Sequence, residues 1–208
     1  PTGFGRDGTA TARHGGVVSI TGAIPGEAVR GRALAHRRGV THARIVEVLD
    51  PSPDRVVPPC AEIANGCGAC PWQHLDLAAQ RTAKVDRVAA ALGVEVDGLE
   101  PLVPLAATGF RTTIQAAVDR GRAGFRRYRS HRVVPVAGCL VAHPLLVDLV
   151  TEARYGDATE VLLRCGSRTG ERMAAPIPHG AAISVPDDVH RDRIHEEAAG
   201  RRWRISAD

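Results

Sequence analysis

The stretch CAEIANGCGACPWQHL, from Cys60 to Leu75, decides how the rest of the chain is interpreted. It places three thiols within eleven residues, in a chain of 208 residues that has only five cysteines. Thiolates are soft ligands that suit zinc or iron–sulfur clusters, and the two-residue spacer between Cys67 and Cys70 lets neighbouring sulfurs reach one centre. Glycines inside the loop permit the close backbone wrapping that such a centre needs. We therefore predict a metal centre here.

Two other interpretations of these cysteines stay open at this point. A disulfide or a set of buried thiols would need no metal, but disulfides form in oxidising compartments and no apolar signal segment precedes the cluster. A zinc site with His74 as its fourth ligand is also possible. The spacing of six residues and then two is less like a zinc ribbon, which pairs one short-spaced cysteine pair with another.

Composition is that of an ordinary soluble protein, with 44% hydrophobic and 24% charged residues. No apolar run is long enough for a membrane helix, so we expect no membrane partner. The net charge of +4 is mildly basic, and Lys84 is the sole lysine. Arginine binds phosphate in a bidentate manner and stacks on bases, which suits RNA, although codon bias in a GC-rich genome also explains the excess. Because the chain opens on Pro1, we expect the true start to be missing.

The order of predicted elements indicates two domains. Short strands separated by glycine-rich turns predict a small barrel or sandwich before a proline-rich break at 50–59. A helix is expected over 75–92, ended by Gly93, with an apolar core side and a basic side that carries Lys84. An antiparallel meander is expected over 110–136. Further elements are predicted as follows: strands at 17–20, 28–34, 42–49, 160–164, 181–185 and 202–206, and helices at 144–154 and from Pro186 onward.

Several strings together resemble a known family. They are Pro25-Gly26-Glu27, the run from Ser52 to Arg55 before Pro58-Pro59-Cys60, CGACPWQHL, and AGFRRYRSHRVVPVAGC from Ala123 to Cys139. This combination, with Lys84 and Ala142-His143-Pro144, resembles the S-adenosylmethionine-dependent RNA (uracil-5)-methyltransferases that carry a [4Fe–4S] cluster. The resemblance covers essentially the whole chain. The first cysteine spacer departs from the family in having six residues where five are common, which we interpret as a loop insertion.

The resemblance implies a fold, a ligand set and a location. The fold class is α+β, with an OB-like TRAM barrel at 1–55, then the cysteine loop and an antiparallel-sheet central domain at 56–208 that binds the cluster. The implied ligands are Cys60, Cys67, Cys70 and Cys139. The implied partner is rRNA or tRNA, bound by a cytoplasmic monomer.

By the same resemblance, the activity belongs to a C-terminal Rossmann-like domain that this chain lacks. There a cysteine thiolate adds to C6 of uracil, S-adenosylmethionine methylates C5, and the C5 proton is then lost. No residue here matches that nucleophile, its carboxylate base or the cofactor-binding glycines, so we expect no catalytic or cofactor-binding residue. The chain looks like an amino-terminal fragment or a natural half-protein. The cluster, with four cysteine ligands, is expected to be structural.

The candidate RNA contacts are the densest basic and aromatic residues of the chain. Strand alternation would place arginines on both faces of 123–129, so one face is expected to meet a polyanion. The alternative to a polyanion-binding face is a solvated edge strand whose charges prevent aggregation. The candidates are Phe125, Arg126, Arg127, Arg129, His131 and Arg132, with Tyr128 among them and Lys84 on the helix.

Two further sets of residues carry less weight. Barrel arginines at 30, 32, 37, 38 and 44 fit an OB-type binding face but also an ordinary solvated surface. Cys165 is interpreted as a buried small hydrophobe without a catalytic role.

Two functions of other classes compete with the methyltransferase half. One is a stand-alone RNA-binding module with structural zinc. The other is a radical S-adenosylmethionine enzyme, which the cysteine spacing and the fourth cysteine disfavour.

Overall fold

The computed structural model describes residues 1–5, 7–98 and 103–207, and it is mostly β-sheet with few helices. The chain divides into two compact units, which are described separately below. The first unit comprises residues 1–59 and 70–104, and the second comprises residues 60–69 and 105–208. None of the helices in the described ranges combines the length and apolar character needed to cross a bilayer. The second unit thus takes up the cysteine loop up to residue 69, whereas Cys70 is grouped with the first.

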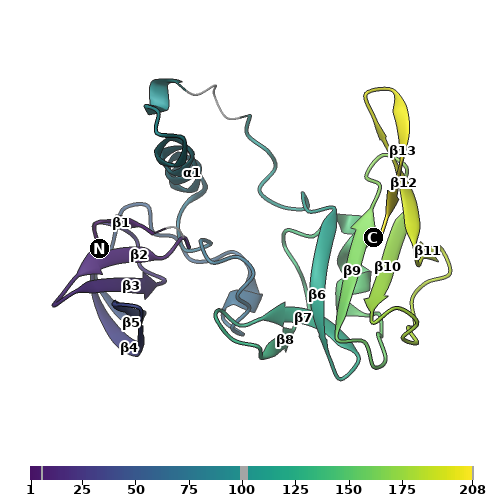
Figure 1. Ribbon diagram of the computed structural model, residues 1–208, viewed down its shortest axis with the longest axis horizontal. Helices are drawn as coiled ribbons and strands as arrows, with labels where there is room; N and C mark the ends of the chain where they lie inside the picture. Colours follow the sequence, from purple (N-terminus) through teal and green to yellow (C-terminus); the bar gives the residue numbers. More distant parts are fainter. Residues whose placement is uncertain (6, 99–102, 208) are drawn as a thin grey trace. The chain divides into compact units, whose positions relative to one another are not determined.

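The first unit is built on one five-stranded sheet in the order β1-β2-β3-β5-β4 (Figure 1). All its neighbouring strands are antiparallel except β3 and β5, which run parallel. Three alanines, Ala10, Ala23 and Ala43, and Ile20 form its core. The three strands predicted here are confirmed, and two short strands at the amino terminus were not predicted. The strands are β1 (Gly3–Phe4), β2 (Ala10–Arg13), β3 (Val17–Thr21), β4 (Ala28–Arg37) and β5 (Val40–Asp50).

A buried carboxylate ties this sheet to the proline-rich segment that follows it. The Glu27 side chain is fully buried and pairs with the Arg55 guanidinium, and it also accepts hydrogen bonds from the backbone N–H groups of Ile24 and Ser52. Burial alone would raise the pKa of Glu27. The hydrogen bonds from Arg55, Ile24 and Ser52 outweigh burial and hold the pKa below its ordinary value of 4.5. Glu27 is therefore a charged anchor of the first unit.

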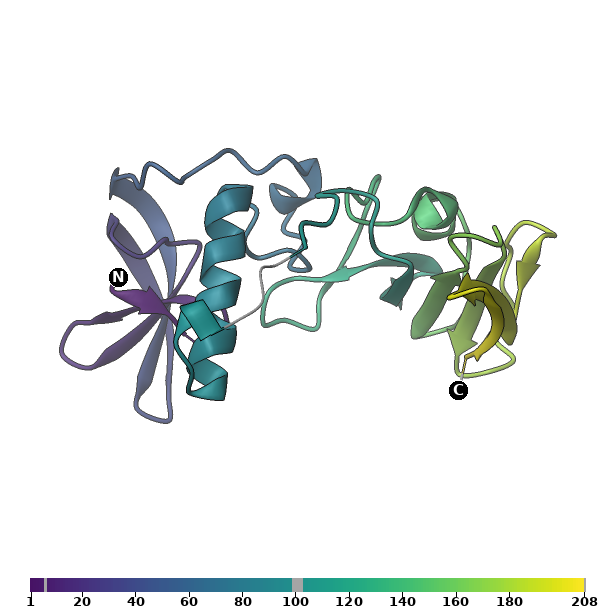
Figure 2. The same cartoon turned by 90° about the horizontal axis from the view of Figure 1, so that it is seen from above.

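Helix α1 (Leu77–Leu92) follows the cysteine loop and belongs to the first unit. Asp76 caps it by accepting from the N–H groups of Ala78 and Ala79, and Gly93 ends it with a left-handed φ of 69°. The predicted helix and its terminator are thus confirmed. The expected core side is wrong: among the described residues of α1 only Ala89 is buried, whereas Leu77, Val88 and Leu92 are exposed. Helix α1 runs beside the strands of the first unit (Figure 2), and alanines line the hollow between it and Gly3 and Phe4 of β1. A 3-10 turn, η2 (Val96–Gly98), lies beyond it.

The second unit is organised around a six-stranded sheet in the order β11-β10-β9-β6-β7-β8 (Figure 1). The predicted meander is confirmed as β6, β7 and β8, each antiparallel to the next. The 3-10 helix η3 and the helix α2 lie in the region predicted as one helix, and His143 caps η3 ahead of Pro144. The bounds are η1 (Ala61–Ile63), β6 (Thr113–Asp119), β7 (Arg122–Arg126), β8 (Val133–Pro135), η3 (Pro144–Leu146), α2 (Val147–Thr151), β9 (Glu160–Cys165), β10 (Arg172–Ile177) and β11 (Val189–His190).

The core of this unit lies between one face of the sheet and the η3–α2 segment. Its largest fully buried side chain is Tyr155, whose hydroxyl donates to the Leu149 carbonyl. Leu146, Leu149, Val161 and Leu163 complete the same cluster with no exposed surface. One face of the sheet is thereby fixed by apolar burial, which leaves the opposite face of β6, β7 and β9 for polar side chains.

The carboxyl-terminal third differs from the sequence prediction. The segment 181–185 forms only one bridge, between Ser184 and Arg154, and the strand beside β9 is β10. The helix expected from Pro186 is wrong, because that segment leads into β11 and the hairpin of β12 (Arg193–Ala198) and β13 (Arg201–Ser206). The strand expected at 202–206 is confirmed as β13. A helix start and a strand-to-strand turn both use proline and aspartate, so those residues alone did not separate the two.

Candidate metal centre and nucleic-acid interface

The cysteine loop is fixed to the β7–β8 region by one backbone hydrogen bond and one from a side chain. The Gly68 N–H donates to the Arg126 carbonyl at 3.1 Å, and the Arg127 guanidinium donates to the Asn65 carbonyl at 3.0 Å. A Cβ on Gly68 would lie 2.4 Å from the backbone nitrogen of Tyr128, so no side chain fits there. The glycine after Cys67 is therefore required by this close approach of two backbones.

A second connection joins the loop to the segment that leads to Cys139. Glu62 is only 6% exposed and its carboxylate accepts from the Ala137 N–H at 2.8 Å. The hydrogen bond from the Asn65 side chain has the largest effect on the Glu62 pKa, and with those from the Ala137 and Gly138 N–H groups it holds this pKa below 4.5, against the effect of burial. Glu62 thus fastens the loop between the first two cysteines to the residues immediately before the fourth.

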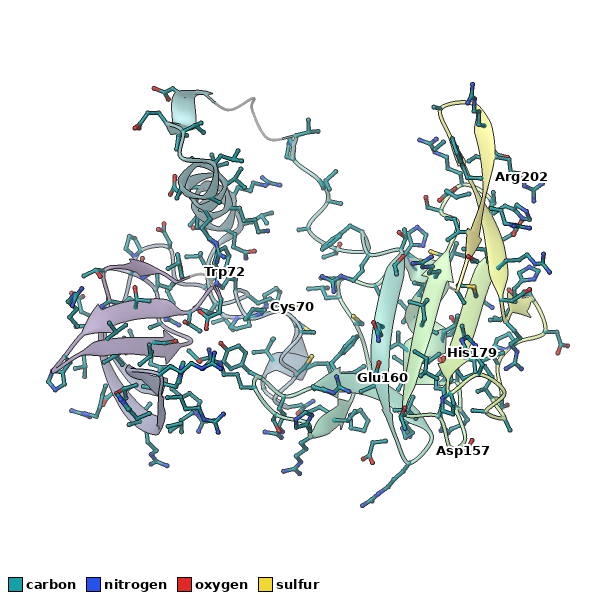
Figure 3. All side chains as sticks on the ribbon, viewed as in Figure 1. Cys70, Trp72, Asp157, Glu160, His179 and Arg202 are labelled. Atoms are coloured by element: carbon teal, nitrogen blue, oxygen red, sulfur yellow. The ribbon has the colours of Figure 1, made fainter. Side chains whose placement is uncertain are left out.

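The four predicted cysteine ligands are all partly buried, and none takes part in a disulfide. Cys60, Cys67 and Cys139 belong to the second unit, and Cys70, which Figure 3 labels, is grouped with the first. Within residues 1–5, 7–98 and 103–207, no three His, Cys, Asp or Glu side chains are arranged to hold a metal ion. The donor chemistry and the docking of the loop nevertheless fit a thiolate-bound metal, because Glu62 holds the sequence neighbours of Cys60 and Cys139 together.

The basic segment after Gly124 is a strand only as far as Arg126. Residues 127–130 form a turn in which Arg129 has a φ of 52°, so the strand alternation predicted through Arg129 is wrong. Phe125 packs against the core, whereas Arg126, Arg127, Arg129, His131 and Arg132 are exposed. The Arg129 guanidinium lies 5.5 Å from the centroid of the Tyr128 ring. The turn therefore gathers cations at one place, while Phe125 is held mainly by the core.

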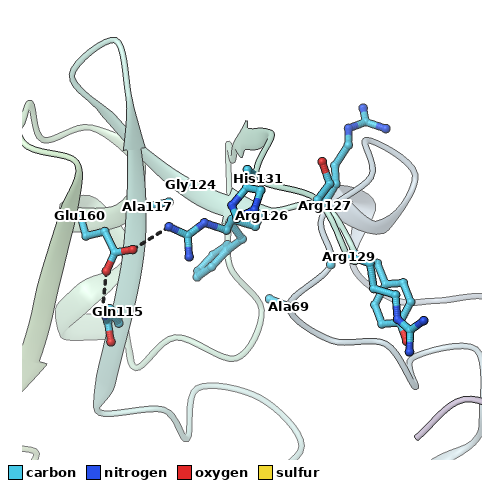
Figure 4. Close-up of a pocket in the computed structure, with 13 residues that line it drawn as sticks. Ala69, Gln115, Ala117, Gly124, Arg126, Arg127, Arg129, His131 and Glu160 are labelled. Carbon is cyan, nitrogen blue, oxygen red and sulfur yellow. Dashed lines mark hydrogen bonds and ion pairs between the residues drawn. The ribbon is translucent and has the colours of Figure 1, made fainter. Parts of the chain in front are cut away.

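A cavity of about 700 Å³ lies beside this turn, entirely within the second unit (Figure 4). Glu160 stands at one end, where its two carboxylate oxygens accept from the Gln115 amide at 2.5 Å and from the Arg126 guanidinium at 2.6 Å. These bonds, the Gln115 bond first, hold the Glu160 pKa below 4.5 despite burial. The remaining lining is Gly68, Ala69, Ala117, Gly124, Phe125, Arg127, Tyr128, Arg129, Ser130 and His131.

The other predicted residues lie elsewhere. Lys84 is exposed on α1, in the first unit, as are the five barrel arginines, of which Arg30 pairs with Glu47. His74 is partly buried, and its Nε2 has no hydrogen-bond partner in the described part of the chain. Burial is the main cause of the lowered pKa of His74, and the nearby Arg55 charge adds to it. Because its pKa is lowered, His74 is neutral at pH 7.

Cys165 is 4% exposed and packs in the core at the end of β9. Burial, with a smaller effect of Glu196, raises the pKa of its thiol to about 11. The thiol is therefore protonated near neutral pH, which agrees with the predicted inert role.

Sequence reasoning missed Glu62, Gln115 and Glu160. The hydrogen-bond partner of Glu62 on the Cys139 side is 75 residues away, and Glu160 is 34 residues from Arg126 and 45 from Gln115. Such pairings depend on strand register. The one local signal was Glu62 itself, an acidic residue in the loop between Cys60 and Cys67, which is otherwise made of small and apolar residues.

Proteins named as RNA methyltransferases are similar to this chain in sequence. No protein-family model matches the chain. It is 36% identical to a protein of Streptomyces avermitilis described as an uncharacterized RNA methyltransferase, over all of this chain and 57% of that protein. It is also 36% identical to the 23S rRNA (uracil(1939)-C(5))-methyltransferase RlmD of Halomonas elongata, over 99% of this chain and 43% of that protein. The chain spans about half the length of the curated relatives it matches, and they support the RNA methyltransferase family that the sequence resembles.

A solved structure is similar in fold. The tRNA (uracil-54, C5)-methyltransferase of Pyrococcus abyssi, in complex with S-adenosyl-L-homocysteine, superposes with a TM-score of 0.60 over 90% of this chain and 55% of that one. Sequence identity is 18%, so the match concerns the fold alone.

Proposed function

We propose that this chain is the RNA-binding, [4Fe–4S]-bearing part of an S-adenosylmethionine-dependent RNA (uracil-C5) methyltransferase that acts on rRNA or tRNA as a cytoplasmic monomer. The observation that carries the proposal is 36% identity, over essentially the whole chain, to a protein named for methylation of uracil C5 in 23S rRNA. The loop between Cys60 and Cys67, docked beside the basic turn, supports it. Residues 1–55, which contain the five-stranded sheet of the first unit, are the proposed TRAM barrel.

In this proposal Cys60, Cys67, Cys70 and Cys139 hold the cluster. With four thiolate ligands it supplies structural cross-linking. This chain's own residues position the ligand segments and present cations to RNA. Glu62 joins the loop between Cys60 and Cys67 to the segment before Cys139. Arg127 fixes the same loop to the basic turn through the Asn65 carbonyl. Recognition of the methyl donor and attack on uracil belong to the part of the protein outside this chain.

The activity is tested with the complete product of the gene that encodes this chain. RNA containing [5-³H]uridine is incubated with that protein and S-adenosylmethionine, and released tritium is counted. We expect release that requires the methyl donor, because methylation at C5 expels the C5 hydrogen. Methylation of RNA without tritium release would place the methyl group on another atom and contradict the uracil-C5 assignment.

Replacing Glu62 by alanine is expected to lower the iron content of anaerobically purified protein severalfold. The change removes the carboxylate that accepts from the backbone N–H groups of Ala137 and Gly138, next to Cys139, so the cysteine loop loses its link to this segment. Glu95→Ala, which removes an exposed carboxylate from the first unit, is the matched control and should keep its iron. Full iron content in Glu62→Ala, with an unchanged far-UV circular dichroism spectrum, would contradict a positioning role for this carboxylate.

Replacing Arg129 and Arg132 by alanine is expected to weaken binding of single-stranded RNA and to flatten its salt dependence. Removing one cation that neutralises a phosphate reduces the slope of log K against log salt by about 0.7 for a single strand. Arg127 is left intact because its guanidinium also holds the cysteine loop. Filter binding at about 50 to 300 mM salt, a range that includes physiological ionic strength, measures the slope of log K against log salt.

The matched control removes the same charge from the β11–β12 region through Arg191→Ala and Arg193→Ala, both exposed in the second unit. It should retain the wild-type slope. Identical slopes for all three proteins would assign the turn to an ordinary solvated surface.

A further inference from the structure

The open face of the six-stranded sheet carries a row of small residues that ends in a carboxylate. Gly124 on β7 pairs directly with Ala117 on β6, and Ala117 pairs directly with Glu160 on β9. Residues paired across neighbouring strands point to the same face. A Cβ on Gly124 would lie 2.3 Å from the Val134 carbonyl oxygen, so this position stays without a side chain. The row therefore makes a flat floor, and all three residues line the cavity of about 700 Å³ shown in Figure 4.

The wall of this cavity is a fixed polar network. Gln115 and Arg126 each donate to a different oxygen of Glu160, and the Glu160 side chain is 23% exposed. An ionised carboxylate has about four acceptor sites, and these two bonds use two of them. Glu160 is therefore held rigidly and still has acceptor capacity toward the cavity.

The rim of this cavity carries basic side chains, in contrast to the carboxylate of its wall. Arg127 and Arg129 line the end of the same cavity away from Glu160, and His131 lies beside Arg126 (Figure 4). A ligand that suits both parts has an anionic backbone for the rim and a flat group with hydrogen-bond donors for the floor and wall. An unpaired nucleotide of RNA has this construction, and a cavity of this size holds one.

We infer that this cavity binds one unpaired nucleotide of the RNA and selects guanine at that position. Guanine presents two adjacent donors, N1–H and the 2-amino group, to the two oxygens of one carboxylate. Uracil presents a single N3–H between two carbonyl oxygens, which the Glu160 carboxylate repels. The inference rests on the proposed RNA-binding function and adds a base preference to it.

The test uses fluorescence anisotropy of the 208-residue chain with labelled RNA heptamers. One heptamer is all uridine, and the others carry a central guanosine, inosine, adenosine or cytidine. We expect the guanosine heptamer to bind about tenfold more tightly than the uridine heptamer, the gain of a hydrogen bond to a charged group. Inosine lacks the 2-amino group and should fall between them.

Glu160→Gln should abolish the guanosine preference, because the new amide offers one acceptor fewer and adds a donor. Glu171→Gln is the matched control: its side chain is 21% exposed, and it also pairs with an arginine, Arg202, in the second unit. It should keep the preference. If all heptamers bind equally well to the wild-type chain, or if Glu160→Gln keeps the preference, the inference is wrong while RNA binding stands. If no heptamer binds, the RNA-binding function and the inference fail together.

Discussion

Cys67→Ser and Cys139→Ser are each expected to lose the cluster and to destabilise the second unit by several kcal/mol. A structural metal site forms only in the folded chain, so its binding free energy, on the order of 10 kcal/mol, contributes to folding. Both cysteines lie in segments that Glu62 and the β7–β8 region hold in place, so the loss of one ligand leaves a docked loop without its cross-link. The measurement is the thermal unfolding midpoint together with the iron content of each variant.

Cys165→Ala is the control for this experiment. It removes a sulfur that is buried in the core, and it should cost about 1–2 kcal/mol through poorer packing while all iron is retained. Wild-type iron content and unfolding midpoint in Cys67→Ser or Cys139→Ser would remove these residues from the ligand set.

Glu27→Ala is expected to destabilise the first unit by about 3–5 kcal/mol, because it leaves the Arg55 charge without its buried partner. The change also leaves the N–H groups of Ile24 and Ser52 without an acceptor. Urea unfolding is followed by the fluorescence of Trp72, which packs against Phe4 in the same unit, after Trp203 has been replaced by phenylalanine.

Glu47→Ala is the matched control, since Glu47 and Arg30 are a solvent-exposed pair in the same sheet. Its loss should cost no more than about 1 kcal/mol. Equal unfolding midpoints for the two alanine variants would contradict the role of Glu27 as the anchor between the sheet and the proline-rich segment.

Acid titration gives a second test of the same residue. The pKa of Glu27 is lower in the folded chain than its ordinary value of 4.5. Glu27 therefore stabilises the fold fully above about pH 4.5, and this contribution is lost as the pH falls through the lower, folded pKa. The difference in unfolding free energy between wild type and Glu27→Ala should accordingly shrink below pH 4.5.

The elements that local chemistry specifies could be predicted from the sequence. Helix α1 was predicted from its helical period and from Gly93, and the meander was predicted over 110–136. In each case the residues that determine the structure lie within about twenty positions of one another.

The remaining features depend on contacts between distant segments. Glu62 joins Ala137, 75 positions away, and Glu160 joins Arg126, 34 positions away. The exposure of the apolar side of α1 likewise depends on what packs beside it. Strand β10 contains Pro176 and a run of small residues, so propensity alone favoured a strand at 181–185 instead. In the structure β10, and not the segment 181–185, pairs with β9.

The central claim is that four cysteines of this chain hold a [4Fe–4S] cluster beside an RNA-binding surface. Its most direct test is the iron, acid-labile sulfide and zinc content of the chain purified without oxygen. We predict about four iron and four sulfide per chain, with broad visible absorption, as the cluster composition requires. One zinc per chain without sulfide, in colourless protein, would contradict the cluster and favour an RNA-binding module with a zinc site.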